Sequence, residues 1–132
     1  MTGFVRTRWR IGIAVVAVLT TALGCIVFAG QAYVASRTPV WIAMLKDSNP
    51  DVRRSGALYL NEMSPPTPAV LDALMGALAD EYVGVRQQAA HGLGKFGAEA
   101  RQALPLLKQA LNDPDAHVRT YAEASLRHIE GS

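Results

Sequence analysis

The feature that most constrains the fold of this chain is an internal repeat with a period of 33 residues. Chemically similar residues recur at this spacing without insertions, in units that cover about residues 32–64, 65–97 and 98–130. A period of this length is typical of proteins built from stacked helical units, each of which contacts only its neighbours. The aligned columns are Leu45, Leu78 and Leu111; Asp47, Asp80 and Asp113; Val52, Val85 and Val118; Arg53, Arg86 and Arg119; Leu60, Leu93 and Leu126; and Met63, Phe96 and Ile129.

The second half of each unit carries one apolar stripe at helical spacing. In unit one the stripe consists of Val52, Gly56, Leu60 and Met63. Such a spacing predicts an amphipathic helix, and the small central residue predicts a close approach of two helices. Ala, Leu, Arg, Gln and Glu favour helices, so an all-α fold is expected. The other two stripes are Val85, Ala89, Leu93 and Phe96, and Val118, Ala122, Leu126 and Ile129.

Proline marks the first helix of each unit. Thr38-Pro39 and Thr67-Pro68 have the pattern of an N-cap followed by the first helical residue. In unit three Pro105 lies inside the helical pattern and predicts a kink or a two-piece helix. The predicted first helices therefore cover residues 39–45, 68–79 and 99–111, and Trp41, Leu74 and Leu107, which share a column, are expected in the core.

The recurring residues distinguish this repeat from other helical repeats of similar length. Ankyrin and tetratricopeptide repeats have periods of about 33 and 34 residues, but their signature residues are absent here. The pattern that recurs is Leu-x-Asp-x-x-x-x-Val-Arg, followed by a small residue and a leucine. It resembles the short HEAT-like repeat first associated with phycobilisome lyases, and residues 85–97 are the closest copy. The resemblance implies an α-solenoid of three HEAT-like helical hairpins and says little about function.

The first 35 residues have the composition of a membrane segment. Residues 11–30 contain no charged side chain, and as a helix they would span about 30 Å, the thickness of a bilayer core. We expect a basic tail over residues 1–10, a single transmembrane anchor helix over 11–35 and a repeat domain over 36–132. Because Arg6, Arg8 and Arg10 precede the apolar run, we expect a cytoplasmic N-terminus and an extracytoplasmic repeat domain.

Two other interpretations of this segment stay open. Residues 22–25 end in Cys25 and resemble a lipobox, so lipidation of Cys25 would anchor a lipoprotein in place of a spanning helix. The apolar run continues past this cysteine, which argues against lipidation. A cleaved signal peptide is the other alternative, although its apolar region usually has about 7–15 residues. Cys25 is the only cysteine, which excludes an internal disulfide and zinc sites built on paired cysteines.

Charge and motif content argue against several function classes. Of 13 Lys/Arg and 11 Asp/Glu, three arginines precede the apolar run, so the repeat region has a net charge of 10 − 11 = −1. Since it has no basic face, we expect no nucleic-acid partner. No nucleophile elbow, phosphate-binding loop or HExxH motif is present, and His91, His117 and His128 occupy different columns. We therefore expect no catalytic, metal or cofactor site, and a protein that is not an enzyme.

Two sets of side chains recur outside the core. The first is Asp47, Asp80 and Asp113 with Arg53, Arg86 and Arg119, for which we expect a structural role. Each aspartate would cap a second helix, and each arginine would pack against a neighbouring unit's carboxylate. The second set lies off the apolar stripe on the second helices, which line the concave side of such solenoids. Its members are Arg54, Gln87 and Thr120 in one column and Leu58, His91 and Ala124 in another.

The mixed polar and apolar character of this second set suits a bound protein or peptide segment. The sequence thus predicts a membrane-tethered, non-enzymatic interaction or scaffold module that binds a protein or peptide on its concave face. One alternative, implied by the family resemblance, is a lyase or lyase-accessory protein, which would need a pocket for a tetrapyrrole. Another is a structural domain that forms a homodimer through its uncapped last repeat, where Tyr121 lies.

Overall fold

A computed structural model describes residues 37–132, which form one compact helical unit. The predicted basic tail, the predicted anchor over residues 11–35 and Cys25 lie outside the described residues. Within residues 37–132, no helix combines the length and apolar character needed to cross a bilayer. Residues 37–44 are helical and are followed by α2 (Pro50–Leu60), α3 (Pro68–Ala77), α4 (Val83–Lys95), the 3-10 helix η1 (Gly97–Ala103), α5 (Leu104–Ala110) and α6 (Ala116–Glu130).

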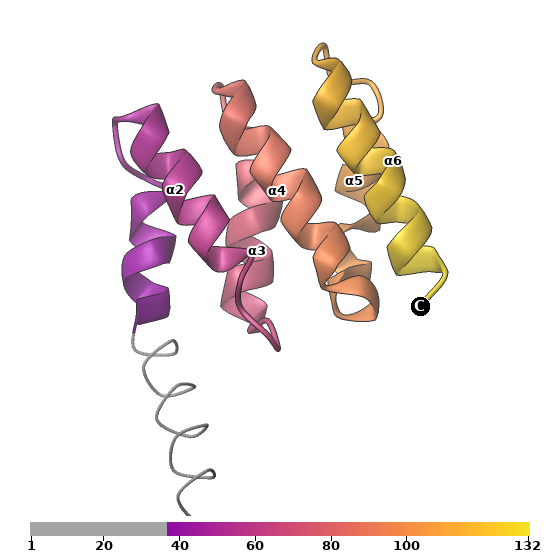
Figure 1. Cartoon of the computed structure of the whole chain (residues 1–132), viewed down its shortest axis with the longest axis horizontal. Helices are drawn as coiled ribbons and strands as arrows, with labels where there is room; N and C mark the ends of the chain where they lie inside the picture. The colour runs from indigo at the N-terminus through magenta and orange to yellow at the C-terminus, as the bar shows by residue number, and fades with distance from the viewer. Residues whose placement is uncertain (1–36) are drawn as a thin grey trace, which may run out of the picture. The chain divides into compact units, whose positions relative to one another are not determined.

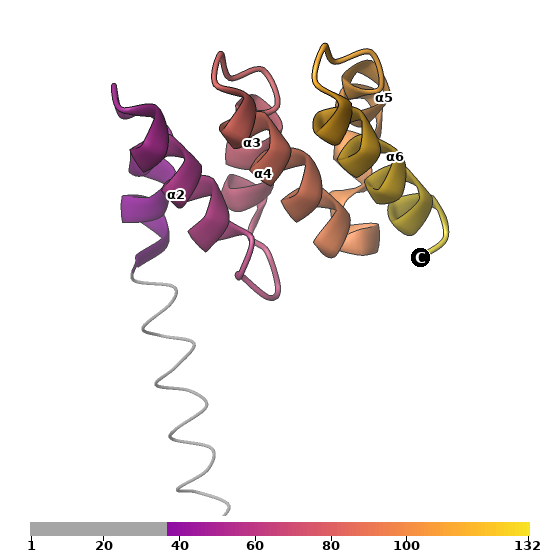
Figure 2. The same cartoon turned by 45° about the horizontal axis from the view of Figure 1, so that its top comes forward.

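The helices form two layers. Helices α2, α4 and α6 lie side by side in one layer, and the helix over residues 37–44, α3 and α5 lie in the layer behind them (Figures 1 and 2). Each first helix is joined to its second helix by a short loop, so residues 37–132 form a row of three helical hairpins. The predicted all-α solenoid of three hairpins agrees with this arrangement.

The apolar stripes of the second helices lie in the core as predicted, except that Val52 in unit one is only half-buried. Val85, Ala89, Leu93 and Phe96 are all buried, and so are the four stripe residues of α6. In unit one Gly56 brings two helices together, since a Cβ there would lie 2.9 Å from the Trp41 carbonyl oxygen. A larger residue at this position would therefore separate the two helices of the hairpin.

The core prediction was wrong for Trp41. Leu74 and Leu107, its equivalents in units two and three, are fully buried, whereas Trp41 is half-buried. Its ring stacks on that of Tyr59 at a centroid distance of 5.7 Å. The difference arises because, among the described residues, no unit precedes unit one to cover this side chain.

The proline signals were correct in two of the three units. The Thr67 hydroxyl accepts a hydrogen bond from the Val70 amide at 3.3 Å, and α3 begins at Pro68. In unit three the predicted two-piece helix is confirmed as η1 and α5, and Pro105 lies in the first turn of α5, where no amide donor is required.

In unit one the predicted start at Thr38-Pro39 is wrong, because residues 37 and 38 are already helical. The Thr38 hydroxyl does not cap a helix start there. It donates to the sulfur of Met63 at 3.6 Å, so this threonine helps to join the first helix to the end of its hairpin.

Candidate functional site

The three units are joined by what we call the arginine–aspartate ladder, made of Arg53, Arg86 and Arg119 with Asp47, Asp80 and Asp113. Arg53 donates through Nε and Nη2 to both carboxylate oxygens of Asp80, at 2.9 and 3.0 Å. Arg86 binds Asp113 in the same way, at 2.8 and 3.1 Å. Two parallel charge-assisted hydrogen bonds fix both the distance and the orientation of a pair, so the ladder sets the register between units.

The third guanidinium nitrogen of each arginine is held by the loop of its own unit. Nη1 of Arg53 donates to the carbonyl oxygens of Asp47 and Ser48, and Nη1 of Arg86 to those of Asp80 and Glu81. Each guanidinium is therefore oriented by its own loop before it meets the next unit's carboxylate.

The aspartates of the ladder do not cap the second helices, and that prediction was wrong. The N-cap residues are Asn49, Tyr82 and Asp115, each two residues after a ladder aspartate. In each unit the aspartate Oδ1 accepts a hydrogen bond from the backbone amide of that N-cap residue, at 2.8 to 2.9 Å. A short acidic side chain favours this local turn over a helix cap, which leaves its carboxylate directed at the neighbouring unit.

The pairing shifts the pKa values of three ladder residues. The hydrogen bonds that they donate to Asp80 and Asp113 raise the pKa of Arg53 and of Arg86. Burial raises the pKa of Asp113, but hydrogen bonds from Arg86 and from the Asp115 amide outweigh it, so this pKa is lowered overall. The pKa of Asp115 is also lowered, chiefly by the hydrogen bond from Gln87.

Five of the six predicted binding residues lie exposed on the second helices: Arg54, Leu58, His91, Thr120 and Ala124. Leu58 is 49% exposed, which is unusual for a large apolar side chain. Gln87 is only half-buried and donates to the Asp115 carboxylate at 3.1 Å, so it also joins unit two to unit three.

Two tyrosines belong to this face: Tyr82 was not predicted as a binding residue, and Tyr121 was named only for the homodimer through the last repeat. The ring of Tyr121 contacts that of His91 at a centroid distance of 5.5 Å. Tyr82 lies beside Arg54 above Gly84, where a Cβ would meet both side chains at 3.0 to 3.1 Å. Both tyrosines are about one-third exposed. The sequence signal that could have found them was an aromatic residue outside the apolar stripe, at the start of the second helix for Tyr82 and within it for Tyr121.

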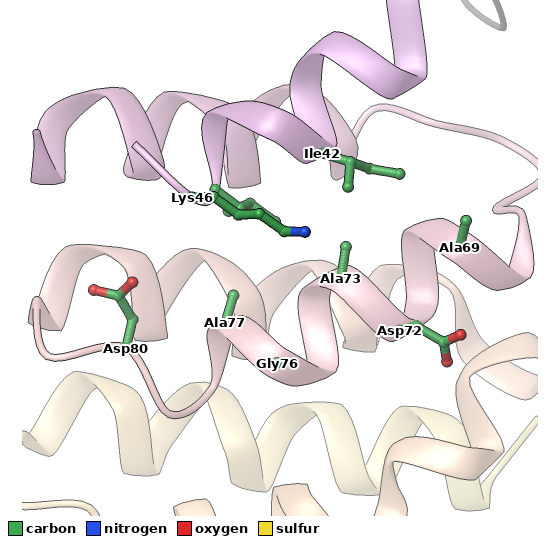
Figure 3. A pocket seen from close by; sticks show the side chains of 9 residues that line it. Ile42, Lys46, Ala69, Asp72, Ala73, Gly76, Ala77 and Asp80 are labelled. Atoms are coloured by element: carbon green, nitrogen blue, oxygen red, sulfur yellow. The ribbon is translucent and has the colours of Figure 1, made fainter. Parts of the chain in front are cut away.

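A groove of about 520 Å³ lies on the other layer, between the helix over residues 37–44 and α3. Figure 3 shows Ile42 and Lys46 extending toward α3, from which Ala73 and Ala77 project into the groove. Small residues on α3 create this space, and a Cβ at Gly76 would have no other atom within 4 Å. The sequence signal was the spacing of Ala69, Ala73, Gly76 and Ala77 along one helix.

The groove is apolar at its floor and charged at its edges. Lys46 and Asp72 are exposed, and Asp80, which lies at the opposite end of α3 from Asp72 (Figure 3), is held by the ladder. This arrangement suits an apolar ligand or side chain with a polar end. Within residues 37–132, no three His, Cys, Asp or Glu side chains are placed to hold a metal ion.

Comparison with known proteins assigns the fold to a family. Residues 38–127 match HEAT repeats, so the chain belongs to the HEAT repeat family. Phycocyanobilin lyase subunit alpha from Nostoc sp. is 35% identical over 96 residues, which cover 67% of this chain and 34% of the relative. The chain therefore spans about one-third of the length of this curated relative.

This relative contradicts the prediction that the protein is not an enzyme, because its name is that of a lyase. The prediction rested on the absence of nucleophile, phosphate and metal motifs from the sequence. That argument fails for a repeat protein, because side chains from separate units can line a reactive groove without forming a local sequence motif.

Proposed function

We propose that this protein is a membrane-tethered HEAT-repeat protein that binds a protein or peptide segment across its second helices. The observation that carries the proposal is the row of exposed side chains on α2, α4 and α6, with Leu58, His91 and Tyr121 as its apolar and aromatic members. Aromatic residues with adjacent polar groups are enriched where proteins bind each other.

The chemistry of this face favours a partner with apolar side chains and at least one carboxylate. Leu58 offers exposed apolar area, and the rings of His91 and Tyr121 offer a flat surface for stacking. Arg54 is exposed on α2, in unit one, and would pair with the partner's carboxylate. The row crosses three units, so an extended or helical segment suits it better than a small molecule.

A pull-down with the full chain in detergent tests this face. The triple variant Arg54→Ala, Leu58→Ser, His91→Ala should lose a partner that the wild type retains. The matched control is Ala98→Ser with Arg101→Ala, two exposed positions on η1, which should retain it. Equal recovery of the partner by the wild type and the triple variant would show that binding does not use this face.

Membrane attachment through residues 11–35 is part of the proposal and is supported by the uncharged run over residues 11–30. The excess of arginine before this run favours display of the repeats outside the cytoplasm. An alkaline phosphatase fused to the C-terminus should then be active, whereas an inactive fusion would reverse the topology. The intact mass of the membrane-extracted chain separates an uncut anchor of 14.2 kDa from a form lipidated at Cys25.

A second candidate function is a lyase-type role at the groove on α3. It is favoured by the 35% identical lyase subunit and by a space of about 520 Å³ with an apolar floor and Lys46 at its edge. Phycocyanobilin added to the full chain should then change its absorbance spectrum. The change should disappear in Gly76→Leu, which fills the groove, and persist in Ala98→Leu. An unchanged spectrum with the wild type would remove this candidate.

A further inference from the structure

The arginine–aspartate ladder is open at its C-terminal end. Nη1 of Arg119 donates to the carbonyl oxygens of Asp113 and Pro114, at 2.8 and 3.0 Å. These are the same two loop contacts that orient Arg53 and Arg86. Arg119 is exposed, and among the described residues its Nε and Nη2 have no carboxylate partner. Its carboxylate-binding edge is therefore already oriented away from unit three.

At the N-terminal end of the ladder, an aspartate lacks its arginine partner among the described residues. Oδ1 of Asp47 accepts a hydrogen bond from the Asn49 amide at 2.8 Å, as the other ladder aspartates do from their own turns. Asp47 is exposed, and within residues 37–132 no arginine binds its carboxylate, although Arg53 binds its backbone carbonyl. This carboxylate is thus held in the orientation in which Asp80 and Asp113 each receive an arginine.

Apolar side chains accompany both open ends. Leu111 is 38% exposed, although its equivalents Leu45 and Leu78 pack against the buried cluster of Ala77, Val85 and Ala89. At the other end Val40 is 53% exposed, and Met44, the equivalent of Ala77, is half-buried. Each end thus exposes the apolar contact that an internal junction covers.

We propose that copies of this chain associate head to tail, with the C-terminal end of one array stacked on the N-terminal end of the next. Arg119 of one copy binds Asp47 of the other, and Leu111 packs against Met44 and Val40. The occupant is a second copy because the two ends carry opposite charges, each already oriented by the contacts that the internal junctions use. This association is independent of the binding face on the second helices.

The geometry distinguishes this association from the predicted homodimer through the last repeat. A two-fold dimer would bring the same surface of both copies together and place one Arg119 against the other. A head-to-tail contact is heterologous and leaves one open end at each end of the assembly, so further copies can add.

The proposed junction is more polar than the junctions inside the chain. Glu123 and Arg127 stand in the columns of Ala90 and Gly94, and they pair with each other at 3.9 Å on the outer flank of α6. The association should therefore be reversible, and it should weaken as the ionic strength rises from about 0.1 to about 1 M.

Sedimentation of the full chain in detergent, over a range of concentrations, tests the proposal. The wild type should form dimers and longer assemblies as its concentration rises. Arg119→Ala and Asp47→Ala should each associate at least about 30-fold more weakly, since each removes one partner of a hydrogen-bonded charge pair. Arg101→Ala, an exposed arginine on η1, should behave like the wild type. Circular dichroism checks that every variant is folded.

Mixing the two variants gives the sharpest result. Arg119 of the Asp47→Ala chain can still bind Asp47 of the Arg119→Ala chain, but the other two ends cannot pair. The mixture should therefore form dimers that do not grow, although each variant alone stays monomeric. A wild type that stays monomeric, an Arg119→Ala chain that assembles like the wild type, or a mixture that forms no dimer would each overturn the proposal.

Discussion

The two junctions between repeat units contain equivalent arginine–aspartate pairs. The side chains around these pairs pack differently at the junction of units one and two and at that of units two and three. Arg53–Asp80 and Arg86–Asp113 have nearly identical hydrogen-bond lengths. Between units two and three, the Ser125 hydroxyl donates to the Ala90 carbonyl at 2.8 Å, and a ring nitrogen of His128 lies 2.7 Å from the Gly94 carbonyl. This junction is closely packed on the second-helix side.

The junction between units one and two leaves one buried polar atom without a partner and stays open on its first-helix side. The side-chain Nδ2 of Asn61 donates to the Gln88 backbone carbonyl at 3.0 Å, but the buried Oδ1 of Asn61 has no hydrogen-bond partner. On the first-helix side, the groove lined by Ala73 and Gly76 remains open. The comparison shows that the ladder sets the register at both junctions, whereas the sizes of neighbouring residues decide how tightly each one closes.

The largest expected effect is the loss of an internal ladder pair. Arg86→Ala leaves the Asp113 carboxylate, whose side chain is 10% exposed, without its partner, so we expect a loss of about 3 kcal/mol in the free energy of unfolding. Urea denaturation of the full chain in detergent, followed by circular dichroism, measures this loss. The control is Arg119→Ala at the open end, where we expect a change within about 0.5 kcal/mol. Equal losses for both variants would mean that the pair between units contributes nothing.

A smaller loss is expected when the tight junction is forced apart. A Cβ at Gly94 would lie 2.2 Å from the Ser125 Oγ and 3.0 Å from its Cα, which belongs to the backbone and cannot turn away. Gly94→Ala should therefore destabilise the fold by about 1–2 kcal/mol, even though alanine favours helix by about 1 kcal/mol. Thermal unfolding tests this, and a stabilised variant would show that α4 and α6 can separate without cost.

At the open groove, a glycine-to-alanine substitution is expected to stabilise the fold rather than destabilise it. A Cβ at Gly76 would meet no other atom within 4 Å, so Gly76→Ala should gain helix propensity without a clash. We expect stabilisation by about 0.5–1 kcal/mol, measured under the same conditions as Gly94→Ala. A destabilised Gly76→Ala chain would indicate that the groove is closed in solution.

The smallest expected effect is on the pH dependence of stability. The pKa of Asp113 is lowered from its ordinary value of 3.8, so its contribution is fully present above that value and is lost as the pH falls through the lower folded-state pKa. Asp113→Asn should therefore be less stable than the wild type at pH 7, and the difference should shrink near pH 3. Urea denaturation at both pH values measures it, and a difference that is constant with pH would contradict the lowered pKa.

The sequence alone was sufficient to predict the helical hairpins, since the fold depends on patterns that are local or periodic. Val85, Ala89, Leu93 and Phe96 predicted a buried helix face because their spacing matches the turn of a helix. Pro105 predicted the division between η1 and α5 because proline lacks the amide donor that a continuous helix needs.

The repeat pattern predicted that arginines would meet carboxylates of neighbouring units, but only the tertiary structure decided how the loops are arranged and how closely the units pack. That Asp47, Asp80 and Asp113 bind turn amides rather than cap helices depends on loop conformation, which the repeat pattern does not specify. Whether a glycine closes a junction or opens a groove depends on the opposite residue, Ser125 for Gly94 and empty space for Gly76. Periodicity determines which side of a helix faces the core, but the fit between two helices depends on pairs of side chains far apart in the chain.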